Sequence, residues 1–197
     1  MRAAIERVVV LLFSGFAFCL TIRLGVAEAR LRFNPEPAPS NQLRIEITLN
    51  PRLAMAWIQM GLDAEAAEDL AEAEIDLLQA ARVDRQFVPA WTLANFYFRR
   101  GDSVNFWSWG RKAAAMTFDD YRPLLRLADV LEPSPRKVAI RLGSSPPLLR
   151  AYMDFLIGAG RLDAAQEIAA LLDSNSNHDP SDAARVADLA DRRRRAN

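Results

Sequence analysis

Cysteine and histidine are almost missing from this chain, and its charges sum to zero. Cys19 is the only cysteine in 197 residues, so an internal disulfide is excluded. His178 is the only histidine, which excludes a metal site built from several imidazoles. The 25 lysines and arginines balance 25 aspartates and glutamates. Because general nucleic-acid binding needs an excess of clustered cations, this balance argues against a nucleic-acid partner.

The motifs that usually accompany catalysis are absent as well. Gly158-x-Gly160 lacks the flanking strand and the lysine of a phosphate-binding loop, and a lone histidine in a polar stretch does not form a triad. Residues 63–76 are rich in carboxylates, but their helical pattern places these groups on a solvent face, with nothing apolar to raise a pKa. We therefore expect no enzymatic activity, no cofactor and no metal ion.

The N-terminal segment combines a basic start with a long apolar run. Residues 8–27 contain a single charge, Arg23, and follow Arg2 and Arg7, as in an export signal. A membrane helix needs about 20 apolar residues, and Arg23 would have to extend its side chain to the headgroups. We expect a single-span inner-membrane anchor of bacterial type, with the rest of the chain in the periplasm. The alternative is cleavage near Ala29 and secretion.

Changes in composition divide the chain into four expected parts. Three prolines keep the segment after the apolar run extended. Residues 43–49 alternate apolar and polar side chains as a strand does, but no partner strand follows, so a short capping helix is expected there. The four parts are a membrane helix with its flank at 1–33, a proline-rich linker and lead-in at 34–48, helical repeats at 49–173, and a flexible linker with a short basic helix at 174–197.

Apolar residues recur at helical spacing from residue 54 onward. Turn-forming residues separate the periodic segments. Pro89 suits the first turn of a helix, where its missing N–H is not needed, and the sequence Gly101-Asp102-Ser103 suits a turn followed by a helix cap. The helices expected on this basis cover residues 54–66, 69–83, 88–100, 103–117, 121–131, 135–142, 146–158 and 162–172.

A 34-residue interval connects three of these segments. Trp57 and Trp91 are 34 residues apart, and Leu125 continues the interval. This is the period of the tetratricopeptide repeat, a pair of antiparallel helices, and the chain resembles that family. With Trp57 at the family's tryptophan position, Gly61 falls at its glycine position and Ala73 at the small residue of the second helix. The resemblance implies an all-α fold, a short α-solenoid of helix-turn-helix repeats.

The second repeat departs from the family pattern. Asn95 stands where the glycine belongs, Trp107 where a small residue belongs, and Arg111 where a bulky apolar residue belongs. We therefore expect the second helix of this repeat to be rotated or displaced. The family pattern also implies that Trp57 and Trp91 are core residues that fill the gap between helices.

Members of this family mostly hold a peptide or protein segment in a concave groove formed by the first helix of each pair. The resemblance therefore implies a non-enzymatic interaction scaffold. Arg99, Arg126 and Arg150 would share one face with Phe96, which suits a peptide carrying acidic or C-terminal carboxylate groups. The groove residues carried over by their position relative to the tryptophans are Ile58, Leu62, Glu65, Thr92, Phe96, Arg99, Arg126, Val130, Arg150 and Asp154.

An accessory subunit of a larger membrane-bound machine is the alternative role. Such a machine could serve secretion, polysaccharide export or electron transfer. A permanent subunit would need a bare aromatic surface, for which Tyr97 and either Trp107 or Trp109 are candidates. Expressing residues 43–197 alone distinguishes the two roles. An adaptor would remain a soluble monomer, whereas a subunit removed from its machine would aggregate.

Overall fold

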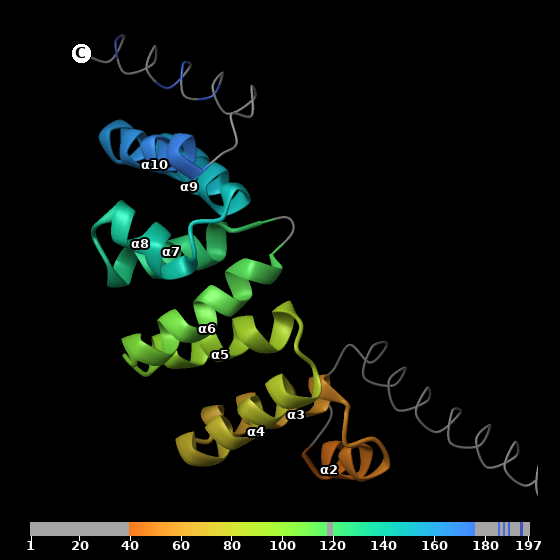
Figure 1. Ribbon diagram of the computed structural model, residues 1–197. Helices are drawn as coiled ribbons and strands as arrows, with labels where there is room; N and C mark the ends of the chain where they lie inside the picture. Colours follow the sequence, from red (N-terminus) through yellow and green to blue (C-terminus); the bar gives the residue numbers. More distant parts are fainter. Residues whose placement is uncertain are drawn as a thin grey trace, which may run out of the picture. The chain divides into compact units, whose positions relative to one another are not determined.

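The computed structural model describes residues 40–117 and 120–175, together with Arg185, Ala187, Leu189 and Arg194. Every regular element in these residues is an α-helix, which confirms the predicted all-α class for this part of the chain (Figure 1). None of these helices has the length and apolar character that crossing a membrane requires. The expected anchor at 8–27, the cleavage position near Ala29 and most of the expected linker at 174–197 lie outside the described residues.

The helices fall into two compact units, residues 1–85 and residues 86–197. The first contains α2 (Ser40–Leu49), α3 (Ala54–Ala66) and α4 (Leu70–Val83). The second contains α5 (Phe87–Arg99), α6 (Ser103–Met116), α7 (Arg122–Leu131), α8 (Pro135–Leu142), α9 (Pro146–Gly158) and α10 (Leu162–Asn175). The predicted boundaries of α3, α8 and α9 are confirmed, those of α4 to α7 differ by one residue, and α10 runs three residues further than predicted.

In the first unit, α3 and α4 form a helical hairpin, and α2 packs against α3. Residues 40–49 are helical despite their alternating pattern, as expected for a capping helix. Leu43 of α2 is fully buried in a small core with Leu53, Ala56 and Met60. Asp69 begins α4 by accepting a hydrogen bond from the Glu72 backbone N–H at 3.1 Å, which satisfies one of the free donors of the first turn.

The α3–α4 hairpin is closely packed at a glycine. A Cβ atom added to Gly61 would lie 2.7 Å from Cγ of Leu77 and 3.1 Å from the carbonyl oxygen of Ala73. Leu77 and Ala73 are both fully buried. The absence of a side chain at Gly61 therefore lets α4 approach α3, which is the physical role that the family pattern assigns to this glycine.

Replacing Gly61 with alanine is expected to destabilise the chain by up to about 2 kcal/mol. Overpacking a helix contact costs about 1–3 kcal/mol, and removing a helical glycine returns about 1 kcal/mol. Gly158→Ala is the matched control, because a Cβ at Gly158 meets nothing within 4 Å. Its stability should stay the same or rise. Urea unfolding followed by circular dichroism measures both changes, and equal effects would contradict the close approach at Gly61.

Trp57 is not a core residue, contrary to the family-based prediction. Its ring is half-buried, and its indole N–H donates a hydrogen bond to the Pro51 carbonyl oxygen at 2.9 Å. This bond holds the ring against the α2–α3 turn at the edge of the small core. Because a half-buried ring leaves a smaller cavity when it is removed, Trp57 contributes less to stability than a fully buried tryptophan would.

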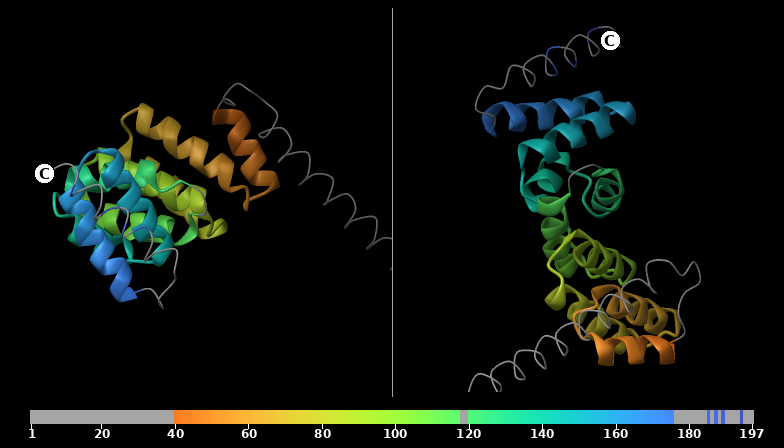
Figure 2. Two further views of the ribbon diagram at one scale, coloured as in Figure 1. Left: turned by 90° about the horizontal axis from the view of Figure 1, so that it is seen from above. Right: turned by 90° about the vertical axis from the view of Figure 1, so that its right-hand side faces the viewer.

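In the second unit, two hairpins enclose a shorter helix pair. The hairpins are α5–α6 and α9–α10, and α7 and α8 lie between them (Figure 1). Helix α8 packs against both α6 and α10, and α7 packs against α9. Figure 2 shows the two helices of the α9–α10 hairpin side by side in both further views. Helices α6, α8 and α10 thus pack in succession, and α7 packs on α9.

Tyr97 and Trp107, two candidates for an exposed aromatic surface, are buried. Tyr97 is 3% exposed and Trp107 is 8% exposed. Trp107 meets Phe106 edge to face at 5.1 Å between ring centroids, and the Arg141 guanidinium lies over its indole at 5.0 Å. Only Trp109 of the three candidates for an exposed aromatic surface is half-buried. The expectation of an exposed Tyr97 is therefore wrong, because this ring packs against that of Phe96 at 5.3 Å.

Candidate functional site

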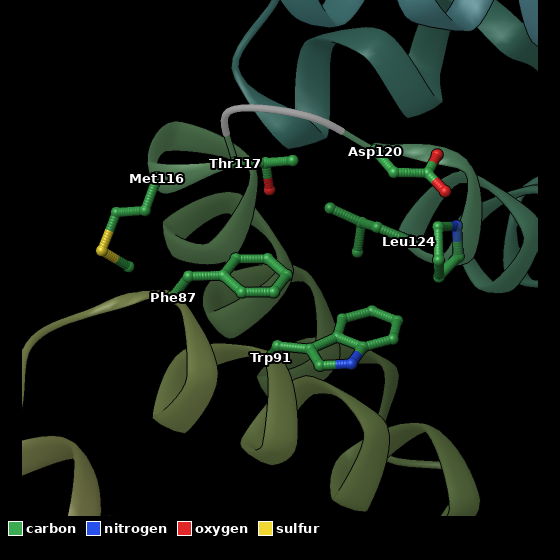
Figure 3. Close-up of a pocket in the computed structure, with 7 residues that line it drawn as sticks. Phe87, Trp91, Met116, Thr117, Asp120 and Leu124 are labelled. Carbon is green, nitrogen blue, oxygen red and sulfur yellow. The ribbon is translucent and has the colours of Figure 1, made fainter.

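An apolar pocket of about 380 Å³ opens between α5 and the start of α7 (Figure 3). We call it the α5–α7 pocket. The rings of Phe87 and Trp91 extend from α5 toward Leu124 of α7, and Asp120 lies on the α7 side (Figure 3). Most of its wall is carbon, so it suits an apolar side chain. The residues that line it are Phe87, Trp91, Met116, Thr117, Asp120, Pro123 and Leu124.

Local contacts hold the walls of this pocket in place. The Phe87 and Trp91 rings are separated by one helical turn and are parallel within 8°, with centroids 6.2 Å apart. The Tyr121 hydroxyl donates to the Thr117 carbonyl oxygen at 3.0 Å, which connects the end of α6 to the start of α7. Burial raises the pKa of Tyr121, so this hydroxyl keeps its proton and remains a donor. Trp91 therefore lines a pocket and does not fill the core. The family-based prediction of a core position is wrong for Trp91 as well.

A second, more polar depression of about 580 Å³ lies between α7 and α9. We call it the α7–α9 groove. Asp120 lines both this groove and the α5–α7 pocket, so the two adjoin. Together they extend along α5, α7 and α9, the first helices of the three pairs. The residues that line the groove are Asp120, Tyr121, Arg122, Arg126, Ala151, Asp154, Phe155, Gly158 and Ala159.

Two ion pairs neutralise most of the charge in the groove. Asp120 accepts hydrogen bonds from Nε and Nη2 of Arg122 at 2.8 and 3.2 Å. These bonds and the Arg122 backbone N–H lower the pKa of Asp120, so it is ionised at neutral pH. Asp154 accepts a hydrogen bond from Nη1 of Arg185 at 2.9 Å. Arg126 is exposed and forms no ion pair or hydrogen bond with another described group, and its positive charge contributes to the lowered pKa of Asp120.

A partly buried cluster of polar side chains fixes α9 against α7. The Tyr152 hydroxyl of α9 donates to Oδ1 of Asp129 on α7 at 3.1 Å. Arg161, at the start of α10, forms an ion pair with Oδ2 of the same carboxylate. Burial and the Asp129 carboxylate raise the pKa of Tyr152 far above its usual range, so it remains a donor. Asp129 follows Arg126 by three residues on α7, so this cluster positions Arg126 relative to α9.

Only some of the groove residues predicted from the sequence lie at this site. Arg126 and Asp154 line the groove. Arg99 and Arg150 already interact with other groups of the chain, and the Val130 side chain is 72% exposed. Thr92 donates its hydroxyl to the Val88 carbonyl oxygen of its own helix at 2.9 Å. The remaining predicted residues are Ile58, Leu62, Glu65 and Phe96, of which the first three belong to the unit of residues 1–85.

Ile58 and Phe96 require correction as groove residues. Ile58 is 5% exposed and Phe96 is fully buried, so neither side chain presents a surface that a partner could touch. Phe96 packs edge to face on Tyr97, and the Arg100 guanidinium covers its ring at 5.3 Å. Both are large apolar side chains, and the packing of neighbouring helices buries them in the core.

Sequence reasoning missed the apolar half of the site. Phe87, Trp91 and Leu124 were either assigned to the core or not considered. The available signal was the pair Phe87 and Trp91, because aromatic residues four apart lie on the same face of a helix. Phe155 gave no such signal, since its place in the groove depends on how α9 packs against α7.

The described residues contain no group of three or more histidine, cysteine, aspartate or glutamate side chains arranged to hold a metal ion. No protein-family model and no curated protein matches the sequence. The resemblance to tetratricopeptide repeats therefore depends on the spacing of Trp57, Trp91 and Leu125 and on the close approach at Gly61.

Proposed function

We propose that this protein is a non-enzymatic scaffold that holds an extended segment of a partner protein along α5, α7 and α9. One observation carries the proposal. An apolar pocket and a groove with an exposed arginine, Arg126, adjoin at Asp120, on the first helices of successive pairs. This arrangement suits a segment that places an apolar side chain in the pocket and a carboxylate on Arg126.

The chemistry of the two halves defines the partner. Burying a leucine or phenylalanine side chain against Trp91 and Leu124 contributes about 1.5–3 kcal/mol. The Arg126 guanidinium offers the fork of donors that matches a carboxylate. The ion pairs at Asp120 and Asp154 leave Arg126 as the dominant charge of the groove. The favoured ligand is therefore an acidic peptide segment with an aromatic or leucine anchor.

The helical pairs are, on this proposal, tetratricopeptide-like repeats of a short α-solenoid. Two features support this interpretation. Gly61 allows the close helix crossing that the family pattern places there. In residues 86–197, successive first helices and successive second helices pack on each other, as α7 does on α9 and α8 on α6 and α10. Neighbour-to-neighbour packing of this kind is the principle of repeat proteins.

The proposed location follows from the sequence alone. An apolar segment at 8–27 would anchor the scaffold in the inner membrane and keep the helices in the periplasm. Cleavage near Ala29 would instead release a secreted scaffold. A permanent place in a larger membrane-bound machine is the remaining alternative, and the burial of Tyr97 and Trp107 removes two of the exposed aromatics on which it depended.

Selection from a phage-displayed library of random dodecapeptides on the full-length chain tests this function. The unchanged chain is expected to enrich peptides that combine an aromatic or leucine residue with aspartate or glutamate. Arg126→Glu should reduce the affinity of these peptides about tenfold, corresponding to about 1.4 kcal/mol. The matched control is Arg136→Glu, because Arg136 is exposed on α8 and lines neither the pocket nor the groove.

Two results would contradict the proposed function. One is the absence of any enriched peptide class on the unchanged chain. The other is the same enrichment and affinity for Arg126→Glu as for Arg136→Glu, which would show that the groove does not carry recognition. Circular dichroism of both variants checks that the helical content is unchanged.

A further inference from the structure

Arg185, from the C-terminal part of the sequence, contacts the edge of the α7–α9 groove. Arg185 donates to Oδ2 of Asp154 at 2.9 Å, and Asp154 is a lining residue of the groove. Asp154 lies on α9, which packs against the helix that carries Arg126. The groove therefore contains two binding positions of opposite charge, one of which holds an arginine that comes from far along the sequence.

Leu189, four residues after Arg185, is also placed against the protein. Leu189 is 2% exposed, and both residues are helical. Leu189 is thus held by apolar burial, while Arg185 supplies the polar contact to the groove.

The Arg185–Asp154 pair is weak enough to be exchanged. The two side chains are 46% and 58% exposed. An ion pair this exposed to water changes a binding equilibrium constant by no more than about fivefold. A cationic side chain of a bound segment could therefore replace Arg185 on Asp154 at little cost, particularly when neighbouring groups of that segment are already held by Arg126 and the α5–α7 pocket.

We propose that Asp154 is a binding position for a basic side chain of the partner, and that Arg185 occupies it in competition with that side chain. This inference rests on the proposed function, since it assigns a second charge to the same ligand. The partner segment then carries an apolar anchor, an acidic residue for Arg126 and a lysine or arginine for Asp154. The Arg185 side chain acts as an internal competitor that the partner displaces from Asp154.

The composition of peptides selected from the dodecapeptide library separates this inference from the proposed function. Arg185→Ala is expected to increase the enrichment of lysine and arginine and to raise the affinity for such peptides up to about fivefold. Asp154→Asn should abolish the enrichment of basic residues and retain that of acidic residues, which depends on Arg126. Arg136→Ala is the matched control for loss of an exposed arginine away from the groove.

Hydrogen exchange provides a readout that needs no peptide. If Arg185 is held by Asp154, exchange at the amides around residues 185–189 should be faster in Asp154→Asn than in the unchanged chain, and equally fast in Arg185→Ala. Unchanged exchange in Asp154→Asn would overturn the competition.

Each outcome of the selection decides between the two ideas. Acidic enrichment that depends on Arg126, with no basic enrichment in any variant, would overturn the Asp154 position and leave the scaffold intact. Absence of both enrichments would overturn the scaffold and this inference together. Basic enrichment that survives Asp154→Asn would place the basic residue elsewhere and would also overturn the inference.

Discussion

Replacing Asp76 with asparagine is expected to stabilise the α3–α4 hairpin by up to about 3 kcal/mol at pH 7.5 and to have almost no effect at pH 4. Asp76 of α4 is 3% exposed, and its Oδ2 atom has no hydrogen-bond partner. Burial is the main reason that the pKa of this carboxyl rises from 3.8 to about 6; Glu72 raises it further and Arg44 of α2 partly opposes the change.

The direction of this pH dependence follows from the protonation of Asp76 in the folded and the unfolded chain. Between pH 4 and 6 the folded chain binds a proton at Asp76 that the unfolded chain has lost, so the stabilising contribution of this group is complete below about pH 4. It disappears as the pH rises through 6, where the charged carboxylate has to stay buried. A pKa of about 6 against 3.8 corresponds to about 3 kcal/mol. Asparagine carries no charge at either pH and escapes this cost.

Hydrogen exchange of the α4 amides at pH 4 and pH 7.5, after correction for intrinsic rates, measures the effect separately from residues 86–197. Glu72→Gln is the companion variant, because it removes a neighbouring negative charge and leaves the buried carboxyl in place. It should stabilise the hairpin above pH 6 by less than Asp76→Asn does. A loss of stability at pH 7.5 in Asp76→Asn, or an equal gain at both pH values, would contradict the burial of an unpaired carboxylate.

Replacing Asp129 with alanine is expected to destabilise residues 86–197 by about 2–3 kcal/mol. The change removes the acceptor of the Tyr152 hydroxyl and the partner of Arg161. Tyr152 is fully buried, so its hydroxyl would lose a hydrogen bond to a charged group, which is worth about 1.5–3 kcal/mol. The ion pair with Arg161 is partly exposed and adds less.

Hydrogen exchange of the α7 and α9 amides measures this loss. Asp129→Asn should cost about half as much, because the amide oxygen still accepts from Tyr152 while the attraction for Arg161 is gone. The control is Asp173→Ala, since Asp173 is exposed at the end of α10 and a change there should stay within about 0.5 kcal/mol. Equal losses at Asp129 and Asp173 would show that the cluster does not hold α9 against α7.

Helix positions were predictable from sequence because their signals are local. The sequence Gly101-Asp102-Ser103 and the prolines at 133, 135, 146 and 147 stop or start helices through backbone effects that act within a few residues. The interval between Trp57 and Trp91 likewise placed equivalent residues on equivalent helices. The all-α class and the boundaries of α3, α8 and α9 follow from such signals.

Side-chain environments were not predictable to the same degree, because they depend on a neighbouring helix. Asp76 looked like one acid among many on a solvent face, yet it is buried. Trp91 fitted the family's gap-filling position, yet its ring borders a pocket completed by Pro123 and Leu124 of α7. Of the ten predicted groove positions, Arg126 and Asp154 line the groove, and their relative placement depends on the packing of α7 against α9.

Asp120 also sets a rule for how a partner's residues can be spaced. Its ionised carboxylate stands at the junction of the apolar pocket and the groove. On the proposed function, a partner whose acidic residue directly follows its apolar anchor would place that acid beside the Asp120–Arg122 ion pair, where the arginine is already engaged, and not at Arg126. The position of Asp120 would therefore favour segments with at least one neutral residue between anchor and acid.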